Sequence, residues 1–343
     1  MSPRNAFIEL TKHCNLACVH CYVVDNTHRN ELTTDEVKRL LDDLAREGFL
    51  FLTLTGGEVL LRRDFFELAW HAKRLRFAVT VFTNGTLVTD EIADQFVELS
   101  PYLFEVSLHG ATPETCDAAT AVDGSYAQIL AGVRRLRARG LPVRLKANVL
   151  DINTGDVHRV ARLAKELGVS FSSFDPAVFP RFSGQQDALT HLAPVEEIQA
   201  VLADNFRAGT DAEFQAALRH PCPTNDNRPC GIAKPEEVVI GADGYLYPCP
   251  LWRFHGFNLR KVPFREAYQR RAELIPEVID KRWGDLERCA ECDASGQYHH
   301  CFATAMRLTG NPLAHIHANH RVAQATAAAY AQVRQERFAP ARA

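Results

Sequence analysis

Two hydrophobic patterns alternate along the first half of the chain: short apolar runs and apolar stripes with helical spacing. A hydroxyl cap within residues 32–36 begins the first helix, and Gly48 ends it. Between them, apolar side chains recur on one helical face at Val37, Leu40, Leu41 and Leu44. The apolar run from Phe49 to Thr55 follows directly, and its length and composition predict a strand.

The same unit of strand and helix repeats as far as residue 174, starting with a strand at Ala6–Leu10. Further helices are predicted over 64–74, 89–99, 125–139 and 155–167, and further strands over 77–82, 103–108, 143–150 and 169–174. Strands that alternate with helices favour a parallel sheet with right-handed crossovers. We therefore predict an α/β fold, a partial (β/α)6 TIM-like barrel whose chemistry lies at the carboxyl ends of its strands.

Length and composition narrow the class of protein. At 343 residues the chain can bury a large core and also carry an appended unit. The sequence shows no secretory signal and no run of eighteen apolar residues, so we expect a cytoplasmic protein without a membrane partner. Its net charge is -3 and it has no basic tract, so we expect no nucleic-acid partner. The ten cysteines are then reduced and suit metal sites. Nine of them form two groups, and the tenth, Cys116, is expected to be a buried free thiol.

The first group of cysteines lies directly after the first strand. Cys14, Cys18 and Cys21 have the spacing CxxxCxxC. Three thiolates so close together can hold one iron–sulfur cluster and leave one iron open for an outside ligand. A structural zinc loop is the alternative, in which His13 or His20 would complete a tetrahedral site.

This loop, which ends in the aromatic residue Tyr22, resembles that of the radical S-adenosylmethionine (SAM) enzymes. The resemblance implies that the three cysteines are the catalytic centre and bind a 4Fe-4S cluster. It further implies that the amino and carboxylate groups of SAM occupy the open iron. One electron from an external flavodoxin- or ferredoxin-type donor would then split the sulfonium and release a 5′-deoxyadenosyl radical.

Candidate SAM contacts follow the next three strands. Gly56 and Gly57 let the backbone approach a ligand, and the carboxylate of Glu58 can bind an ammonium group. In the radical SAM family this is the GGE motif, whose members bind the SAM amine. The resemblance also places Asn84 and Ser107 near SAM.

One expected SAM contact is missing. Ala121 stands where related enzymes often carry an arginine that pairs with the SAM carboxylate. Lys146 and Asn148 alternate inward with Arg144 on the fifth strand, and we hypothesise that they supply the missing donors. His109, after the fourth strand, is expected to be a packed, hydrogen-bonded histidine rather than a proton-transfer group.

The second group of cysteines lies in the last third of the chain. Residues 238–248 predict a hairpin of two short strands around an Asp-Gly turn, which would bring Cys230 and Cys249 together. The layout resembles the SPASM extension of radical SAM enzymes. That resemblance implies an auxiliary 4Fe-4S cluster held by Cys222, Cys230, Cys249 and Cys301. Four thiolates leave no open iron, so electron transfer or structural support is the expected role.

A second auxiliary site is incomplete in this sequence. Cys289 and Cys292 are present, but Tyr298 and His320 stand where further thiols are expected. Nearby histidines make a third metal site, with zinc or an atypical iron–sulfur cluster, chemically feasible. A site that has decayed is the equal alternative.

The predicted organisation follows from these assignments. It comprises a radical SAM barrel at 1–180, a linker or helical bridge at 181–221, a SPASM-like domain at 222–330 and a C-terminal tail at 331–343. The chain begins only a few residues before the first strand, so recognition of a leader peptide would rest on a separate protein or on the barrel loops.

The resemblance implies the function as well. SPASM-type enzymes mostly modify ribosomally made peptides or protein side chains, so we predict a peptide-modifying radical SAM oxidoreductase. The first alternative is an enzyme that modifies a small molecule such as a tetrapyrrole, a sugar or a cofactor precursor. The second is a non-catalytic iron–sulfur or zinc scaffold, against which the intact cysteine loop and Glu58 argue, because a scaffold needs no open iron.

Overall fold

A single curved sheet organises the computed structural model, which describes residues 4–23, 30–208, 229–230, 232, 236–287 and 300–338. Its strand order is β6-β5-β4-β3-β2-β1-β7-β8-β9. The first six strands are β1 (Arg4–Thr11), β2 (Phe49–Gly56), β3 (Ala78–Thr83), β4 (Leu103–Ser107), β5 (Val143–Asn148) and β6 (Ser170–Asp175). Neighbours among these six are parallel, and the sheet does not close on itself. The predicted partial (β/α)6 barrel is confirmed.

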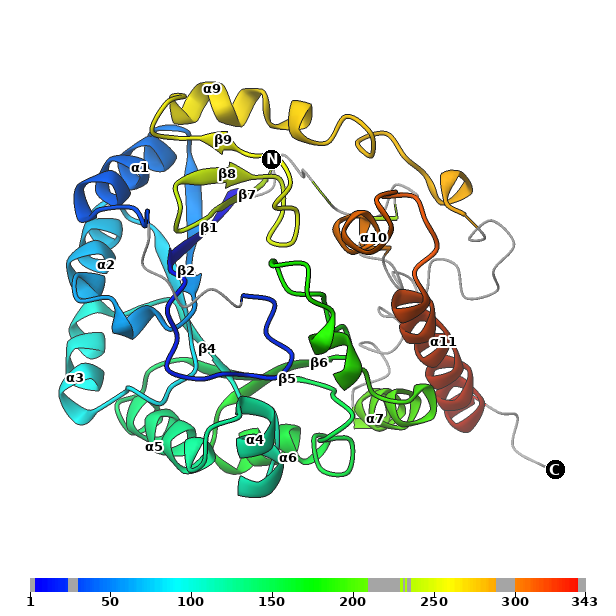
Figure 1. The fold of residues 1–343 in the computed structure, drawn as a ribbon. Helices are drawn as coiled ribbons and strands as arrows, with labels where there is room; N and C mark the ends of the chain where they lie inside the picture. The colour runs from blue at the N-terminus through cyan, green and yellow to red at the C-terminus, as the bar shows by residue number, and fades with distance from the viewer. Residues whose placement is uncertain are drawn as a thin grey trace.

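Helices cover the outer face of this sheet (Figure 1). They are α1 (Thr34–Arg46), α2 (Phe65–Arg74), α3 (Asp90–Leu99), α5 (Ser125–Ala138) and α6 (Arg159–Glu166). The hydroxyl of Thr33 caps α1 by accepting a hydrogen bond from the Glu36 N–H, and the predicted apolar stripe of α1 is buried. In the core, the ring centroids of Phe96 and Phe104 lie 4.7 Å apart, so α3 packs directly on β4.

One short helix was not part of the predicted alternation of strands and helices. α4 (Pro113–Thr120) follows β4, with the hydroxyl of Thr112 as its N-cap and Ala121 in the left-handed region at its end. A helix of this length shows too few turns for hydrophobic periodicity to mark it. Cys116 lies inside it and is fully buried, as expected.

The C-terminal part of the chain extends the barrel sheet. β7 (Glu237–Ile240) and β8 (Tyr245–Tyr247) form the predicted antiparallel hairpin, and β9 (Phe257–Asn258) pairs with β8. β7 also lies parallel to β1, with Ile8 opposite Ile240. The predicted domain boundary at residue 222 therefore does not separate two sheets, because the hairpin continues the sheet of the barrel.

Helices complete the C-terminal part. They are α7 (Val195–Ala208), α9 (Phe264–Gln269), α10 (Phe302–Thr309) and α11 (His317–Phe338), with the short 3-10 helices η1 (Val59–Leu61), η2 (Asp187–His191), η3 (Arg271–Leu274) and η4 (Trp283–Asp285). Phe206 of α7 stacks on Tyr330 of α11 at 4.3 Å between ring centroids. α11 continues to Phe338, so residue 331, where the predicted tail begins, lies inside this helix. None of the helices in the described ranges combines the length and apolarity that crossing a membrane requires.

Candidate active site

The loop that carries the three N-terminal cysteines leaves β1 and crosses the mouth of the barrel (Figure 1). Backbone hydrogen bonds attach it to the end of α4: the N–H groups of Ala17 and Val19 donate to the carbonyls of Thr120 and Ala119, each at 3.0 Å. α4 therefore orients the loop, although its own sequence gave no sign of this task.

Burial raises the pKa of all three loop thiols. The effect is largest at Cys18, where the neighbouring Cys21 and Cys14 add to it because like charges repel. Buried thiols this close together stay protonated at neutral pH unless a positive group offsets their charge, and the irons of a cluster do so. In the described part of the chain, no three Cys, His, Asp or Glu side chains converge as ligands of one metal ion, so the cluster and the zinc alternative at this loop both stay predictions.

The two glycines of the GGE motif bring the end of β2 against the cysteine loop. A Cβ at Gly56 would lie 2.2 Å from the carbonyl oxygen of Thr11, and a Cβ at Gly57 would lie 2.1 Å from that of His13. Gly56 also has a φ of +137°, which side chains rarely adopt. The N–H groups of Gly57 and Glu58 donate to these same two carbonyls at 2.8 Å. The glycines are therefore required for the packing of the loop itself.

Glu58 is fully buried and faces the protein. Its carboxylate accepts hydrogen bonds from the Thr83 hydroxyl at 2.8 Å, the Asn84 N–H at 2.7 Å and the Leu60 N–H at 3.1 Å. Burial raises the pKa of Glu58, and these hydrogen bonds oppose the shift. In this arrangement the side chain braces the carboxyl ends of β2 and β3, and its contact with a SAM amine stays a prediction.

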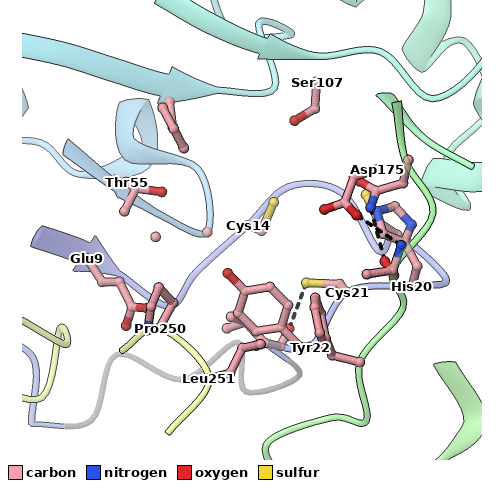
Figure 2. Close-up of a pocket in the computed structure, with 18 of the residues that line it drawn as sticks. Glu9, Cys14, His20, Cys21, Tyr22, Thr55, Ser107, Asp175, Pro250 and Leu251 are labelled. Atoms are coloured by element: carbon pink, nitrogen blue, oxygen red, sulfur yellow. Dashed lines mark hydrogen bonds between the residues drawn. The ribbon is translucent and has the colours of Figure 1, made fainter. Parts of the chain in front are cut away.

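A cavity of about 940 Å³ lies in front of the cysteine loop, between the barrel and the C-terminal segment. Most of the predicted cofactor-binding residues line it: Cys14, Cys18, Cys21, Gly56, Gly57, Asn84, Ser107, Lys146 and Asn148. Figure 2 shows the thiols of Cys14 and Cys21 with Ser107 on one side and Leu251 on the other. Glu58 is the one predicted SAM contact outside this lining.

Lys146 is held on the cavity wall by two neighbours. Its Nζ lies 3.7 Å from the ring centroid of Phe82 and 3.7 Å from Oε2 of Glu105. Burial lowers the pKa of Lys146, and Glu105 opposes this. Arg144 pairs with the same Glu105 carboxylate at 3.3 Å, and it does not line the cavity. The side-chain amide of Asn148, which does line the cavity, donates a hydrogen bond to the Ala177 carbonyl at 3.4 Å.

The family model of the radical SAM superfamily matches residues 8–173. The chain is also 35% identical over 320 residues to an Fe-coproporphyrin III synthase from Methanosarcina barkeri, which covers 82% of this chain and 79% of that protein. The chain belongs to the radical SAM superfamily.

Further relatives of this radical SAM protein are named as enzymes with different activities. An AdoMet-dependent heme synthase of Methanosarcina barkeri is 29% identical, covering 91% of this chain and 95% of that protein. Mycofactocin maturase MftC of Mycobacterium tuberculosis is 32% identical, and the match covers 89% of this chain and 79% of that protein. The solved structure of native anSMEcpe with bound AdoMet has a TM-score of 0.71 at 16% identity and covers 98% of both chains, so it shows the same fold.

Three C-terminal thiols of the radical SAM protein face the same cavity as its cysteine loop. Cys230, Cys249 and Cys301 all line it. The Sγ atoms of Cys249 and Cys301 accept backbone hydrogen bonds from Trp252 at 3.2 Å and Thr304 at 3.4 Å, and Cys301 is the N-cap of α10. Burial, together with a smaller effect of Cys301, raises the pKa of Cys249 to about 12.

The remaining predicted metal ligands, Cys222, Cys289 and Cys292, lie outside the described residues, as does Tyr298. Of the neighbouring histidines, His300 is buried and its Nε2 lies 2.9 Å from the Pro312 carbonyl. The rings of His315 and His320 lie 5.1 Å apart. The third metal site stays a prediction.

His109 is buried, and its Nδ1 accepts the Asn148 N–H at 3.2 Å, which confirms the expected packed histidine. Burial lowers its pKa well below the usual range. Its ring also lines the cavity, 4.5 Å from the ring of His20. The hydrogen bond at Nδ1 places the proton of the neutral ring on Nε2.

Sequence analysis missed the buried pair of Glu9 and Arg253, which joins β1 to the loop after β8. Glu9 lines the cavity between positions whose apolar side chains are fully buried, Ile8 and Leu10. Alternation along β1 was the available signal, because a carboxylate on the inner face of a strand points into the barrel.

Proposed function

We propose that this enzyme reductively cleaves SAM at a 4Fe-4S cluster held by Cys14, Cys18 and Cys21, and abstracts hydrogen from a substrate bound in the adjoining cavity. The observation that carries the proposal is the meeting of the three thiols and the glycine pair on one cavity wall. When bound, the cluster supplies one electron, which converts SAM to methionine and a 5′-deoxyadenosyl radical. A flavodoxin- or ferredoxin-type protein would provide that electron.

The residues of the chain would perform separate tasks. The cysteine thiolates hold the cluster, while Gly56 and Gly57 allow the backbone to approach both the loop and the ligand. Asn84 and Ser107 present polar side chains from the ends of β3 and β4 to the same space. Lys146 and Asn148 would offer donors to a carboxylate in the absence of an arginine at Ala121.

For the substrate we propose a peptide or protein side chain, because the cavity offers no surplus of positive charge. Three basic side chains line the cavity against four acidic ones, Glu9, Asp175, Asp187 and Glu237. Each basic side chain already has an acidic partner: Lys12 with Asp243, Lys146 with Glu105 and Arg181 with Asp187. A polyanionic substrate would have to compete for these cations, whereas a peptide backbone needs only neutral donors and acceptors.

A small-molecule substrate of the tetrapyrrole class is the second candidate. It is favoured by the heme synthase and Fe-coproporphyrin III synthase, which match the chain over most of their length. The maturase MftC, of comparable identity, favours modification of a precursor. A separate leader-peptide-binding protein would accompany the peptide reaction.

The second cluster is also a proposal. Cys230, Cys249 and Cys301, with Cys222, would hold an auxiliary 4Fe-4S cluster across the cavity from the first. Burial of Cys249 and Cys301 favours an electron-transfer or structural role, since a closed set of four thiolates leaves no iron for substrate.

The test is anaerobic reconstitution with iron and sulfide, reduction with dithionite, addition of SAM and assay of 5′-deoxyadenosine. We expect wild type to produce it and to bind about eight irons, four for each cubane cluster. Cys14→Ala should abolish production and lower the iron content to about four. Cys116→Ala is the matched control, because Cys116 is buried in α4 away from the cavity lining. Equal production by Cys14→Ala and wild type would refute the proposed chemistry.

The substrate class is tested separately with deuterated candidates. A deuterated precursor peptide and deuterated iron-coproporphyrin III are each incubated with enzyme and SAM. Deuterium in 5′-deoxyadenosine identifies the molecule from which hydrogen is abstracted. Label from the porphyrin alone would overturn the peptide proposal and establish the second candidate.

A further inference from the structure

A short segment after β6 also holds the cysteine loop, through backbone carbonyls that α4 does not contact. Arg181 donates from Nη1 to the Cys21 carbonyl at 3.1 Å and from Nη2 to the Val19 carbonyl at 3.5 Å. Its Nε pairs with Asp187 at 2.7 Å, and a turn between Arg181 and Gln185 closes the segment. We name residues 181–187 the strap.

The strap also contacts the C-terminal part through Phe182. The Phe182 N–H donates to the Tyr22 carbonyl at 2.9 Å, and the two rings lie 5.1 Å apart. The guanidinium groups of Arg253 and Arg307 lie 5.1 Å and 5.6 Å from the Phe182 ring centroid, and Arg307 donates to the Phe182 carbonyl at 2.9 Å. The strap therefore touches residues that follow Cys21, Cys249 and Cys301.

The two attachments of the cysteine loop differ in kind. α4 accepts hydrogen bonds from the N–H groups of Ala17 and Val19, the two neighbours of Cys18. The strap instead donates hydrogen bonds to the carbonyls of Val19 and Cys21, and the donor, Arg181, carries a full positive charge. Arg181 is only 15% exposed. A buried charge is screened little by solvent.

We propose that Arg181 is a positioning residue for the N-terminal cluster, which holds the Cys21 end of the loop and raises the reduction potential of the cluster. The inference rests on the proposed binding of a 4Fe-4S cluster by Cys14, Cys18 and Cys21. Two physical effects support it. Net charge and hydrogen bonds near a cluster set its potential, and a guanidinium in a fixed plane can serve two carbonyls and a carboxylate at once. The segment predicted as a linker thus becomes part of the cluster site.

Arg181→Ala, Arg181→Lys and Asp187→Asn are reconstituted and compared with wild type in the absence of SAM and substrate. The potential of the N-terminal cluster is measured by electron paramagnetic resonance during a redox titration, and iron loss is measured in the presence of a chelator. Arg135→Ala is the matched control, because Arg135 likewise pairs with an aspartate, Asp90, and donates to a carbonyl, but on α5.

We expect Arg181→Ala to shift the potential in the negative direction and to lose iron roughly ten times faster, the factor that one hydrogen bond to a charged group is worth. Arg181→Lys should keep the potential of wild type, because it keeps the charge, yet lose iron faster, because one ammonium cannot serve both carbonyls. Asp187→Asn should lose iron faster and shift the potential in the positive direction, because it removes a negative charge beside Arg181.

An Arg181→Ala protein with the potential and iron loss of Arg135→Ala would overturn the role of the strap and leave the proposed chemistry intact. Equal changes in Arg181→Lys and Arg181→Ala would refute the charge effect. A wild-type protein that holds no redox-active cluster would instead refute the proposed function, and the strap inference with it.

Discussion

Substitution of Gly57 by alanine is the sharpest test of how the cluster loop is positioned. The new Cβ would lie 2.1 Å from the His13 carbonyl oxygen, whereas real Cβ contacts essentially never fall below 3.0 Å. The backbone must therefore separate by about 0.9 Å. The contact is with backbone atoms of His13 and Cys14, so no flexible side chain can move aside to relieve it. Any shift therefore displaces the start of the cysteine loop.

The magnitude follows from two contributions. Overpacking a tight site costs about 1–3 kcal/mol, and leaving a buried backbone hydrogen bond unmade costs a further ~1–3 kcal/mol. The bond at risk is the one from the Glu58 N–H to the His13 carbonyl, at 2.8 Å. We expect the free energy of unfolding to fall by about 2–6 kcal/mol in total. Displacement of Cys14 should also slow SAM cleavage by about a hundredfold, the cost of a ~1 Å misplacement in a catalytic site.

The assay combines denaturant unfolding of the reconstituted protein with 5′-deoxyadenosine production. Gly155→Ala is the control, because a Cβ there meets nothing within 4 Å and its φ is not positive. The control should stay within about 0.5 kcal/mol of wild type and retain activity. If Gly57→Ala kept full stability and full SAM cleavage, the close approach of β2 to the loop would not position the cluster.

The remaining predictions concern stability. Thr33→Ala removes the cap of α1 and should lower the free energy of unfolding by about 1 kcal/mol, measured by denaturant titration. Hydrogen bonding to Arg260 lowers the pKa of Glu36 to about 2, so its stabilising effect is complete above pH 4.5 and is lost as the pH falls toward 2; unfolding of Glu36→Gln between pH 2 and 6 should show a flatter dependence. Arg253→Ala leaves the buried carboxylate of Glu9 without its partner and should cost about 3–5 kcal/mol, part of which a second change, Glu9→Gln, should restore. Equal stability of Arg253→Ala and wild type would mean that Lys12 alone compensates Glu9.

The agreement between sequence and structure is best where the signal is local. Helix α1 shows this directly: a hydroxyl cap, an apolar stripe and a terminal glycine lie within about sixteen residues, and each acts through neighbours in the chain. The six parallel strands are equally local, since each is a short apolar run between helices. The Asp-Gly turn between β7 and β8 was also predictable, because Gly244 has the left-handed φ of +82° that this turn requires.

The orientation of Glu58 was beyond the sequence. Its motif predicted a ligand for an ammonium group, while the structure surrounds the carboxylate with donors from Thr83, Asn84 and Leu60. A carboxylate accepts from whichever donors the fold presents. Those donors come partly from another strand, so residue type alone could not identify them.

By itself, the sequence determined the alternation of strands and helices, the class of barrel and the two groups of thiols, because these depend on chain neighbours and on the chemistry of side chains. Only the tertiary structure decided that β7 pairs with β1, that the thiols of Cys230, Cys249 and Cys301 share a cavity with the N-terminal loop, and that Arg181 reaches Cys21. Each of these contacts joins residues more than one hundred and fifty positions apart. Packing selects such partners from many that are chemically equivalent, and no local pattern distinguishes them.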